Sequence, residues 1–135
     1  IFLILVLSVL NNYIFSEIFS AYYDITHGVG LAILTPSWMR YILQKDPSVT
    51  WRFVRFAKEV WNLEDQDETK IAYAGIDALE NFFKEAGIPM RLSELGIDDT
   101  YFEEMARHAN RNGRLSNGFV ALNEQDIVKI FKNCL

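Results

Sequence analysis

One stretch limits the fold more than any other, because residues 27–44 read as an apolar helix that must be buried. Its apolar residues recur at a helical spacing, at Leu31, Leu34, Trp38, Tyr41 and Ile42. Further apolar residues fill the positions between them, so the helix is apolar on most sides. Such a helix is central in a fold rather than superficial. Pro36 stands in its middle, and we expect it to kink the helix or split it in two.

Capping residues mark the helices that follow. Asp46 and Pro47 form a strong helix start, with Asp as N-cap and Pro at the first helical position, and that helix is expected to end near residues 62–63. The acidic run at 64–68 suits the positive end of the next helix. A helix carrying Phe102 is expected to be capped by Asp98 or Asp99.

Residues 69–86 form the clearest amphipathic pattern, with an apolar stripe of Ile71, Gly75, Ala78, Leu79, Phe82 and Phe83. Gly87 can adopt the left-handed position that ends a helix, and Pro89 blocks its continuation. Asn123 and Asp126 are placed to cap a last helix, with Leu122 and Ile127 as a hydrophobic staple. No stretch alternates with period two beside hairpin turns. The sequence therefore predicts an all-α bundle of about six helices.

Composition narrows the classes of partner. The 135 residues are enough for one domain, and the 50% that are hydrophobic are enough for a buried core. A net charge of -5 without a basic cluster argues against nucleic acid as a partner. A single cysteine, Cys134, fits a reducing compartment, and we expect a cytoplasmic protein.

The first segment, residues 1–17, differs in kind from the rest. Residues 1–10 carry no charge, and only Ser8 interrupts their apolar run. The run falls short of a membrane span at Asn11 and Asn12, and it lacks the basic start of a signal peptide. Three readings stay open: a buried helix, which we favour, a membrane-seeking anchor, or sequence foreign to the parent fold.

His27 is the first candidate for chemistry, because it stands at a helix start beside Gly28. Without context, a backbone carbonyl or Asp24 would satisfy such a histidine. As a metal ligand it needs partners, since catalytic metals are usually held by three or four protein groups. Tyr13 and Glu17 are the nearby candidates, and their spacing puts them on one helix face.

The other reactive residues have simpler readings. His108 is interpreted as a solvated histidine on a polar helix face, and it has no ligand spacing with His27. Cys134 is interpreted as a small apolar residue or free thiol near a fraying terminus. Glu103 and Glu104 are assigned to a solvent-exposed helix face. Phosphate-binding glycine motifs are absent from the sequence, which predicts that the chain has no nucleotide-binding unit of its own.

Residues 20–39, SAYYDITHGVGLAILTPSWM, resemble the metal-site signature of the iron-containing alcohol dehydrogenases, and most of all their butanol dehydrogenase branch. Two later segments agree in order and spacing. The first is Gly87-Ile88-Pro89 followed by Leu92, Leu95, Gly96 and Ile97. The second is Phe119, Leu122, Asp126 and Ile127. The resemblance covers roughly residues 18–135, and residues 1–17 do not share it.

The resemblance implies two domains in the family: an α/β domain that binds NAD or NADP, and a helical C-terminal domain that holds iron or another divalent metal. In that helical domain an Asp and three histidines bind the metal, which polarises the oxygen of a small alcohol or aldehyde while hydride passes to or from the nicotinamide. His27 matches the last of these ligands. This chain would then be the helical domain, incomplete at its N-terminus.

Two departures from the family pattern bear on activity. Tyr13 stands where the family has its third ligand, a histidine, and Glu17 stands where it has a further active-site histidine. The first two ligands would lie upstream of Ile1. Three hypotheses follow: part of a butanol-type dehydrogenase, a helical remnant or interaction module without chemistry, or a small membrane-anchored protein, which we disfavour. Any apolar surface left exposed predicts self-association.

Overall fold

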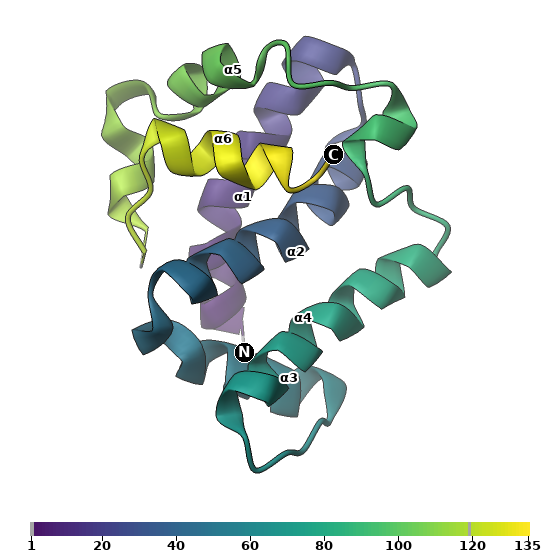
Figure 1. The fold of residues 1–135 in the computed structure, drawn as a ribbon, viewed down its shortest axis with the longest axis vertical. Coiled ribbons are helices and arrows are strands. Elements are labelled where there is room, and N and C mark those ends of the chain that lie inside the picture. The colour runs from purple at the N-terminus through teal and green to yellow at the C-terminus, as the bar shows by residue number, and fades with distance from the viewer. Residues whose placement is uncertain (1, 119) are drawn as a thin grey trace.

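The computed structural model describes residues 2–118 and 120–135, with side chains described from Tyr13 onward. Within those ranges the chain forms six α-helices and no strand, which confirms the predicted all-α fold (Figure 1). The helices are α1 (Phe2–Tyr23), α2 (His27–Lys45), α3 (Thr50–Trp61), α4 (Glu68–Glu85), α5 (Phe102–Ala109) and α6 (Glu124–Lys132). Three short 3-10 helices complete the fold: η1 (Pro47–Val49), η2 (Leu92–Leu95) and η3 (Arg111–Asn117).

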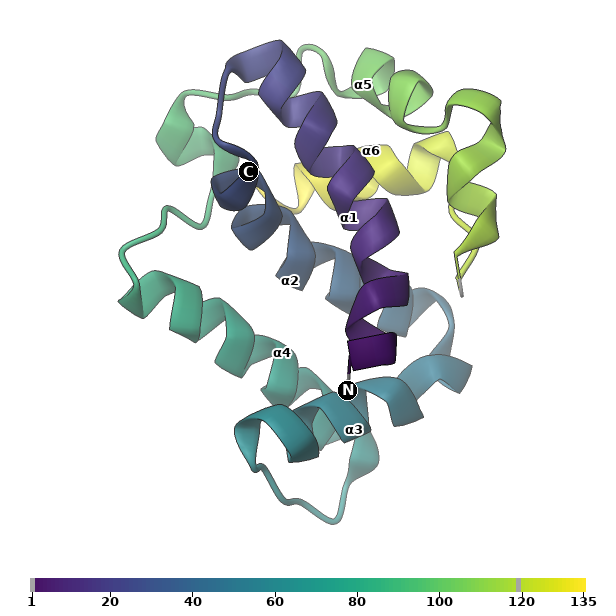
Figure 2. The same ribbon diagram turned by 180° about the vertical axis from the view of Figure 1, so that it is seen from behind.

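Helix α2 is the central element of the bundle, as its apolar sequence predicts. It packs against α1, α4 and α6. Figures 1 and 2 show α3 and α4 on one side of it and α5 and α6 on the other, and α1 packs against α2 and α5. Trp38 and Ile42 of α2 are each 1% exposed. The helix continues unbroken through the buried Pro36, so the expected split does not occur.

A cluster of aromatic rings joins α1, α5 and α6. Phe131 of α6 lies with its ring centroid 4.8 Å from that of Phe19, 5.4 Å from that of Phe15 and 5.5 Å from that of Phe102. All four side chains are fully buried. Edge-to-face packing of this kind stabilises a core beyond the area that it buries. The second half of α1 is therefore an integral part of the core, while the side chains of residues 1–12 lie outside the described set.

Helices α3 and α4 run in roughly the same direction. The loop at 62–67 carries the chain back to the starting end of α3 before α4 begins (Figures 1 and 2). A Cβ atom built on Gly75 would lie 2.7 Å from the Cβ of Ala57, so glycine allows the two helices to approach closely. Asp67 caps α4 by accepting a hydrogen bond from the backbone N–H of Lys70 at 3.2 Å.

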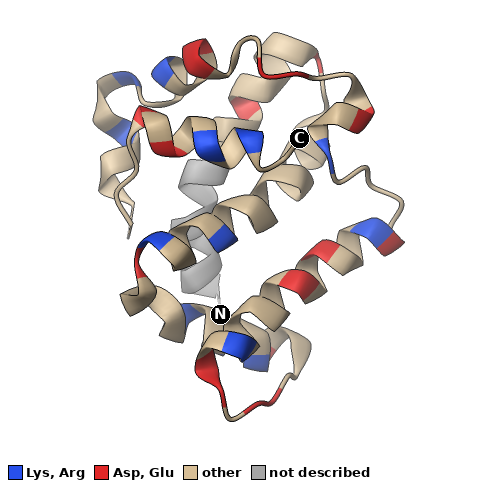
Figure 3. Cartoon of the chain, viewed as in Figure 1, with Lys and Arg blue, Asp and Glu red and all other residues tan. Residues whose placement is uncertain are grey.

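The predicted helix ends are largely confirmed. Gly87 has φ of 80°, and its N–H and that of Ile88 donate to the carbonyls of Lys84 and Phe83, which is a Schellman end to α4. Asn123 and Asp126 form the predicted capping box of α6. Figure 3 shows α6 beginning with acidic and ending with basic residues, the order that its dipole favours.

Two local predictions were wrong. Asp98 accepts a hydrogen bond from the N–H of Thr100 and so caps the turn before α5, while the N-cap position of α5 is Tyr101. On α4 the apolar stripe is buried only in its first half, and Phe82 is 54% exposed. Burial along α4 is a tertiary property: Ile71 and Ile76 are in the core, while Phe82 meets only the edge of the fold, with Trp61 of α3 6.1 Å from it between ring centroids.

None of the described helices is long and apolar enough to cross a membrane. Phe119, one of the residues of the sequence resemblance, lies outside the described residues.

Candidate functional site

The predicted site residues come from two neighbouring helices. Helix α2 starts at His27, and α1 carries Tyr13 and Glu17 one turn apart. Asp24 stands between the helices with φ of 52°, in the left-handed region, where the chain reverses direction. Tyr13 and Glu17 are exposed and His27 is half-buried. The topology therefore gathers all three where the start of α2 lies against the second half of α1.

The imidazole of His27 lies against the phenol of Tyr13. Their ring centroids are 5.0 Å apart, and the planes meet at 67°, an edge-on contact. The hydroxyl of Tyr13 donates a hydrogen bond to the carboxylate of Glu17, and this bond raises the pKa of Tyr13 above its usual 10.0. The structure thus brings together the histidine and the two residues that the sequence singled out beside it.

The backbone at His27 is fixed by a hydrogen bond from α1. Ser16 is fully buried, and its hydroxyl donates to the carbonyl of His27 at 2.7 Å. Gly30, one turn further along α2, faces the same serine, and a Cβ atom there would lie 2.7 Å from Ser16 Oγ. Close packing of the two helices at Gly30 therefore sets where the His27 backbone lies.

The donors near His27 do not amount to the four-ligand site of the family. They comprise one imidazole, one carboxylate and one phenol, and the phenol and carboxylate are bonded to each other. Among the described residues no group of three His, Cys, Asp or Glu side chains lies close enough together to hold a metal ion. The residues present therefore do not fit the metal site that the resemblance implies.

His108 is exposed on α5, as predicted, but it is not simply solvated. Its Nδ1 lies 2.9 Å from the hydroxyl of Tyr22, which donates to Oε1 of Glu104 at 2.8 Å. Glu104 is exposed, as the sequence predicts, and it also accepts this hydrogen bond from α1. The missed signal was the four-residue spacing of Glu104 and His108, which puts both on one face of α5. The partner from α1 could not be read from the sequence.

Cys134 is held in the core rather than at a fraying end. Its side chain is 3% exposed, and its carbonyl accepts a hydrogen bond from the N–H of Leu92 at 2.8 Å. Burial raises the pKa of the thiol to about 11. A thiol of this kind is inert at neutral pH, which agrees with the non-catalytic interpretation.

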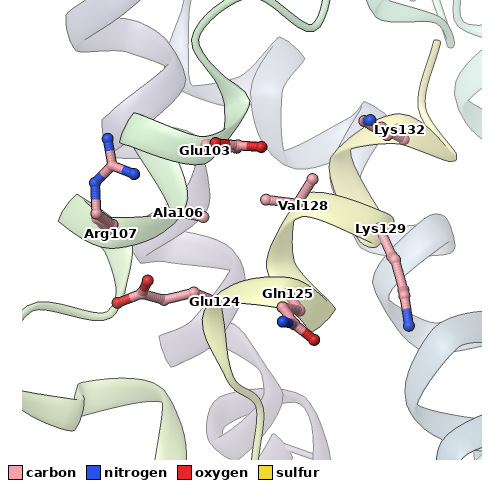
Figure 4. A pocket seen from close by; sticks show the side chains of 8 residues that line it. All are labelled: Glu103, Ala106, Arg107, Glu124, Gln125, Val128, Lys129 and Lys132. Atoms are coloured by element: carbon pink, nitrogen blue, oxygen red, sulfur yellow. The ribbon is translucent and has the colours of Figure 1, made fainter.

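A groove between α5 and α6 is a further concave feature of the described surface. Its volume is about 420 Å³, and Figure 4 shows its lining, which is Glu103, Ala106, Arg107, Glu124, Gln125, Val128, Lys129 and Lys132. Neither histidine lines it. Its acidic and basic side chains are interspersed around a small apolar floor, so it does not select one class of charged ligand.

The comparisons with known proteins agree with this fold. The model of the "Fe-containing alcohol dehydrogenase family, C-terminal" matches residues 15–135. NADH-dependent butanol dehydrogenase A from Clostridium acetobutylicum is 44% identical over 115 residues, which is 84% of this chain and 29% of that protein. The 1,3-propanediol dehydrogenase of Citrobacter freundii is 31% identical over 110 residues, covering 82% of this chain and 28% of its own length.

Among solved structures, an NADH-dependent butanol dehydrogenase A from Thermotoga maritima superposes with a TM-score of 0.77 at 30% identity. The match covers 92% of this chain and 32% of that one. The chain thus spans a little under a third of the relatives that it matches. The family model covers almost the whole sequence, and the fold agrees with it from α1 to α6. This chain belongs to the iron-containing alcohol dehydrogenase family and corresponds to the C-terminal, all-helical part of its members.

Proposed function

We propose that this chain is the helical part of an NAD(P)-linked, metal-dependent alcohol dehydrogenase of the butanol type, interconverting a primary alcohol and its aldehyde. In this proposal His27 is the one metal ligand that the chain contributes, and the chain alone does not turn over. The sequence signature around His27 and the family membership support the first point. The incomplete donor set supports the second.

The contact between Tyr13 and His27 carries the proposal. Two imidazoles that bind one metal through bonds of about 2.0–2.1 Å have ring centroids about 5 Å apart. The phenol ring of Tyr13 lies 5.0 Å from the ring of His27. This separation supports the assignment of Tyr13 to the position where the family has a histidine ligand. The geometry around His27 suits a metal site, and the chemistry of its neighbours does not complete one.

A gain-of-function variant tests this assignment. We expect the double substitution Tyr13→His with Glu17→His to bind Zn²⁺ or Co²⁺ at least tenfold more tightly than the natural chain, because two imidazoles replace a phenol and a carboxylate. Adding His27→Ala should abolish the gain. Calorimetric titration of each purified chain measures it. No gain in the double variant, or a gain that survives His27→Ala, would remove His27 from the ligand position.

Turnover gives the second test. The purified natural chain should not reduce butanal with NADH or NADPH, because one imidazole holds a metal poorly and nothing in the chain is assigned to hold the nicotinamide. The assay follows the absorbance of the reduced nicotinamide, which falls as the cofactor is oxidised, over a period on the order of hours. Turnover that disappears in His27→Ala would overturn the proposal that the chain is incompetent alone.

The second candidate is a helical remnant or interaction module without chemistry. The hydrogen bond between Tyr13 and Glu17 favours it, because the two residues at the altered positions satisfy each other. Phe82, 54% exposed on α4, is apolar surface of the kind that favours association. Self-association and a cytoplasmic location stay predictions. A natural chain whose metal binding does not depend on His27, together with a double variant that gains none, would favour this candidate.

A further inference from the structure

A second cluster of side chains of the types that can ligate metals lies away from His27, between α1 and α5. Tyr22 comes from the last turn of α1, and Glu104 and His108 come from one face of α5. The Tyr22 hydroxyl lies 2.8 Å from Oε1 of Glu104 and 2.9 Å from Nδ1 of His108. Three different donor groups, a phenol, a carboxylate and an imidazole, therefore meet at the end of a single helix contact.

Proton accounting shows what joins these groups. Tyr22 has one hydroxyl hydrogen, and it is donated to Glu104, since an ionised carboxylate can only accept. The bond between Tyr22 and His108 must then use the N–H on Nδ1 of His108, with the hydroxyl oxygen accepting. Two hydrogens thus lie between the three ligand atoms, which are the Tyr22 oxygen, Glu104 Oε1 and His108 Nδ1. A metal cation bound by the same three atoms can replace these hydrogens.

The spacing of the donors suits a cation. Ligands at right angles around a metal with bonds of about 2.1 Å are about 3.0 Å apart. The two distances from the Tyr22 oxygen are 2.8 and 2.9 Å. Glu104 and His108 are both exposed, so their side chains have room to turn toward a shared ion.

We propose that Tyr22, Glu104 and His108 form a surface site for a divalent transition metal ion, with Cu²⁺ bound most tightly. Mixed nitrogen and oxygen ligands suit Cu²⁺, which leads the Irving–Williams order. On binding, the Tyr22 hydroxyl proton passes to water, and the imidazole proton moves from Nδ1 to the outer Nε2 through solvent. Glu104 and the phenolate then each contribute one negative charge against the two positive charges of the metal.

The charges around Tyr22 limit the affinity of the proposed site for a metal ion. Burial, followed by the hydrogen bond to Glu104, raises the pKa of Tyr22, so the metal must displace a proton that the free protein holds firmly. Arg107 lies close enough to act on Tyr22 in the opposite sense. As a cation it also repels a bound metal. The site therefore depends on the metal's own charge to ionise the phenol.

The sequence makes a decisive experiment available, because it holds only two histidines, His27 and His108. Each can be removed while the other stays. Titration of the full chain with Cu²⁺, followed by electron paramagnetic resonance and visible absorption, should show one bound ion per chain. His108→Ala should weaken binding at least tenfold, and His27→Ala should change it less than twofold.

Three further variants report on the individual ligands. Tyr22→Phe should abolish a phenolate-to-copper absorption band while leaving the helical circular dichroism unchanged. Glu104→Gln should weaken binding, whereas the neighbouring Glu103→Gln, which changes a carboxylate on the α5–α6 groove, should not. Arg107→Gln should tighten binding about threefold, since it removes a nearby positive charge.

The variants give results that either support the copper site or overturn it. Binding that survives His108→Ala unchanged, or that is lost in His27→Ala, would overturn the proposal. The same holds if Glu103→Gln weakens binding as much as Glu104→Gln. The Tyr13→His, Glu17→His titration is therefore repeated with His108 mutated to Ala, so that failure of this site and failure of the proposed function are separate results.

Discussion

At the scale of single residues, Asp126 is the charged side chain whose burial matters most. It accepts hydrogen bonds from Tyr41 at 2.6 Å and from the N–H of Asn123 at 2.9 Å, and it forms an ion pair with Lys45. Burial alone would raise the pKa of its carboxyl, but the bonds from Lys45, Tyr41 and Asn123 outweigh burial and lower it. Burial and the same carboxylate raise the pKa of Tyr41 to about 12.

Asp126→Asn should lower the free energy of unfolding by about 1–3 kcal/mol at pH 7, since it removes a charged acceptor from three donors. The carboxyl's pKa is lower in the folded state, so its contribution is complete above the unfolded pKa of 3.8 and is lost as pH falls toward the folded value. Urea unfolding at pH 7 and pH 3 should therefore differ less in the variant than in the natural chain.

The matched control for this prediction is Asp99→Asn, which removes an exposed pair with Lys132 at 3.6 Å. Exposed pairs contribute about 0–1 kcal/mol. Equal losses in the two variants at pH 7 would show that the Asp126 network does not stabilise the contact between α2 and α6.

At the scale of elements, the pair of α3 and α4 depends on one close approach. The Cβ of an alanine at Gly75 would meet the Cβ of Ala57 at 2.7 Å and its Cα at 3.0 Å. The second of these is a backbone atom, so the helices themselves would have to move apart. Gly28, on the exposed start of α2, has nothing within 4 Å of a built Cβ. The two glycines therefore differ in packing although both are helical.

Gly75→Ala should destabilise the chain by about 1–3 kcal/mol, because overpacking outweighs the better helix propensity of alanine. Gly28→Ala should be neutral or stabilising by up to about 1 kcal/mol. Thermal unfolding followed by circular dichroism measures both. Ala57→Gly on the Gly75→Ala background should recover part of the loss, and no recovery would place the cost elsewhere.

At the scale of the whole molecule, the C-terminus closes the fold. The N–H of Leu92 and the hydroxyl of Ser93, both in η2, donate to the carbonyls of Cys134 and Leu135 at 2.8 Å each. Cys134 also donates from its thiol to the carbonyl of Ile130 at 3.3 Å. Residues some forty positions apart in sequence thus hold the last turn against the core. Cys134 can become exposed only when these hydrogen bonds between η2 and the C-terminal residues break.

Alkylation of Cys134 reports on that closure. A pKa of about 11 in place of 9.0 lowers the thiolate fraction at pH 8 by about a hundredfold. The native chain should therefore react with iodoacetamide at least about a hundredfold more slowly than the urea-unfolded chain. Mass spectrometry over time measures the rates. A native rate within tenfold of the unfolded rate would mean that the C-terminus frays.

Much of the local structure was predictable because its causes are local. The capping box of Asn123 and Asp126, the Schellman end at Gly87 and the buried face around Trp38 follow from short-range geometry and helical period. The exposure of Phe82 was not predictable, because periodicity shows which face is apolar but not whether another element covers it. For the same reason, the sequence predicts the residues near His27 and the helix face that they share, but not the contacts that they make with another helix.

The sequence by itself determined the helical fold and the place of His27 at the start of α2 beside α1, because caps, glycines and apolar spacing act over a few residues. Only the tertiary structure decided that Tyr13 lies edge-on to His27 at 5.0 Å, and that Tyr22 reaches Glu104 and His108 more than eighty residues away. Those contacts depend on how helices pack, and packing is set by the whole core at once.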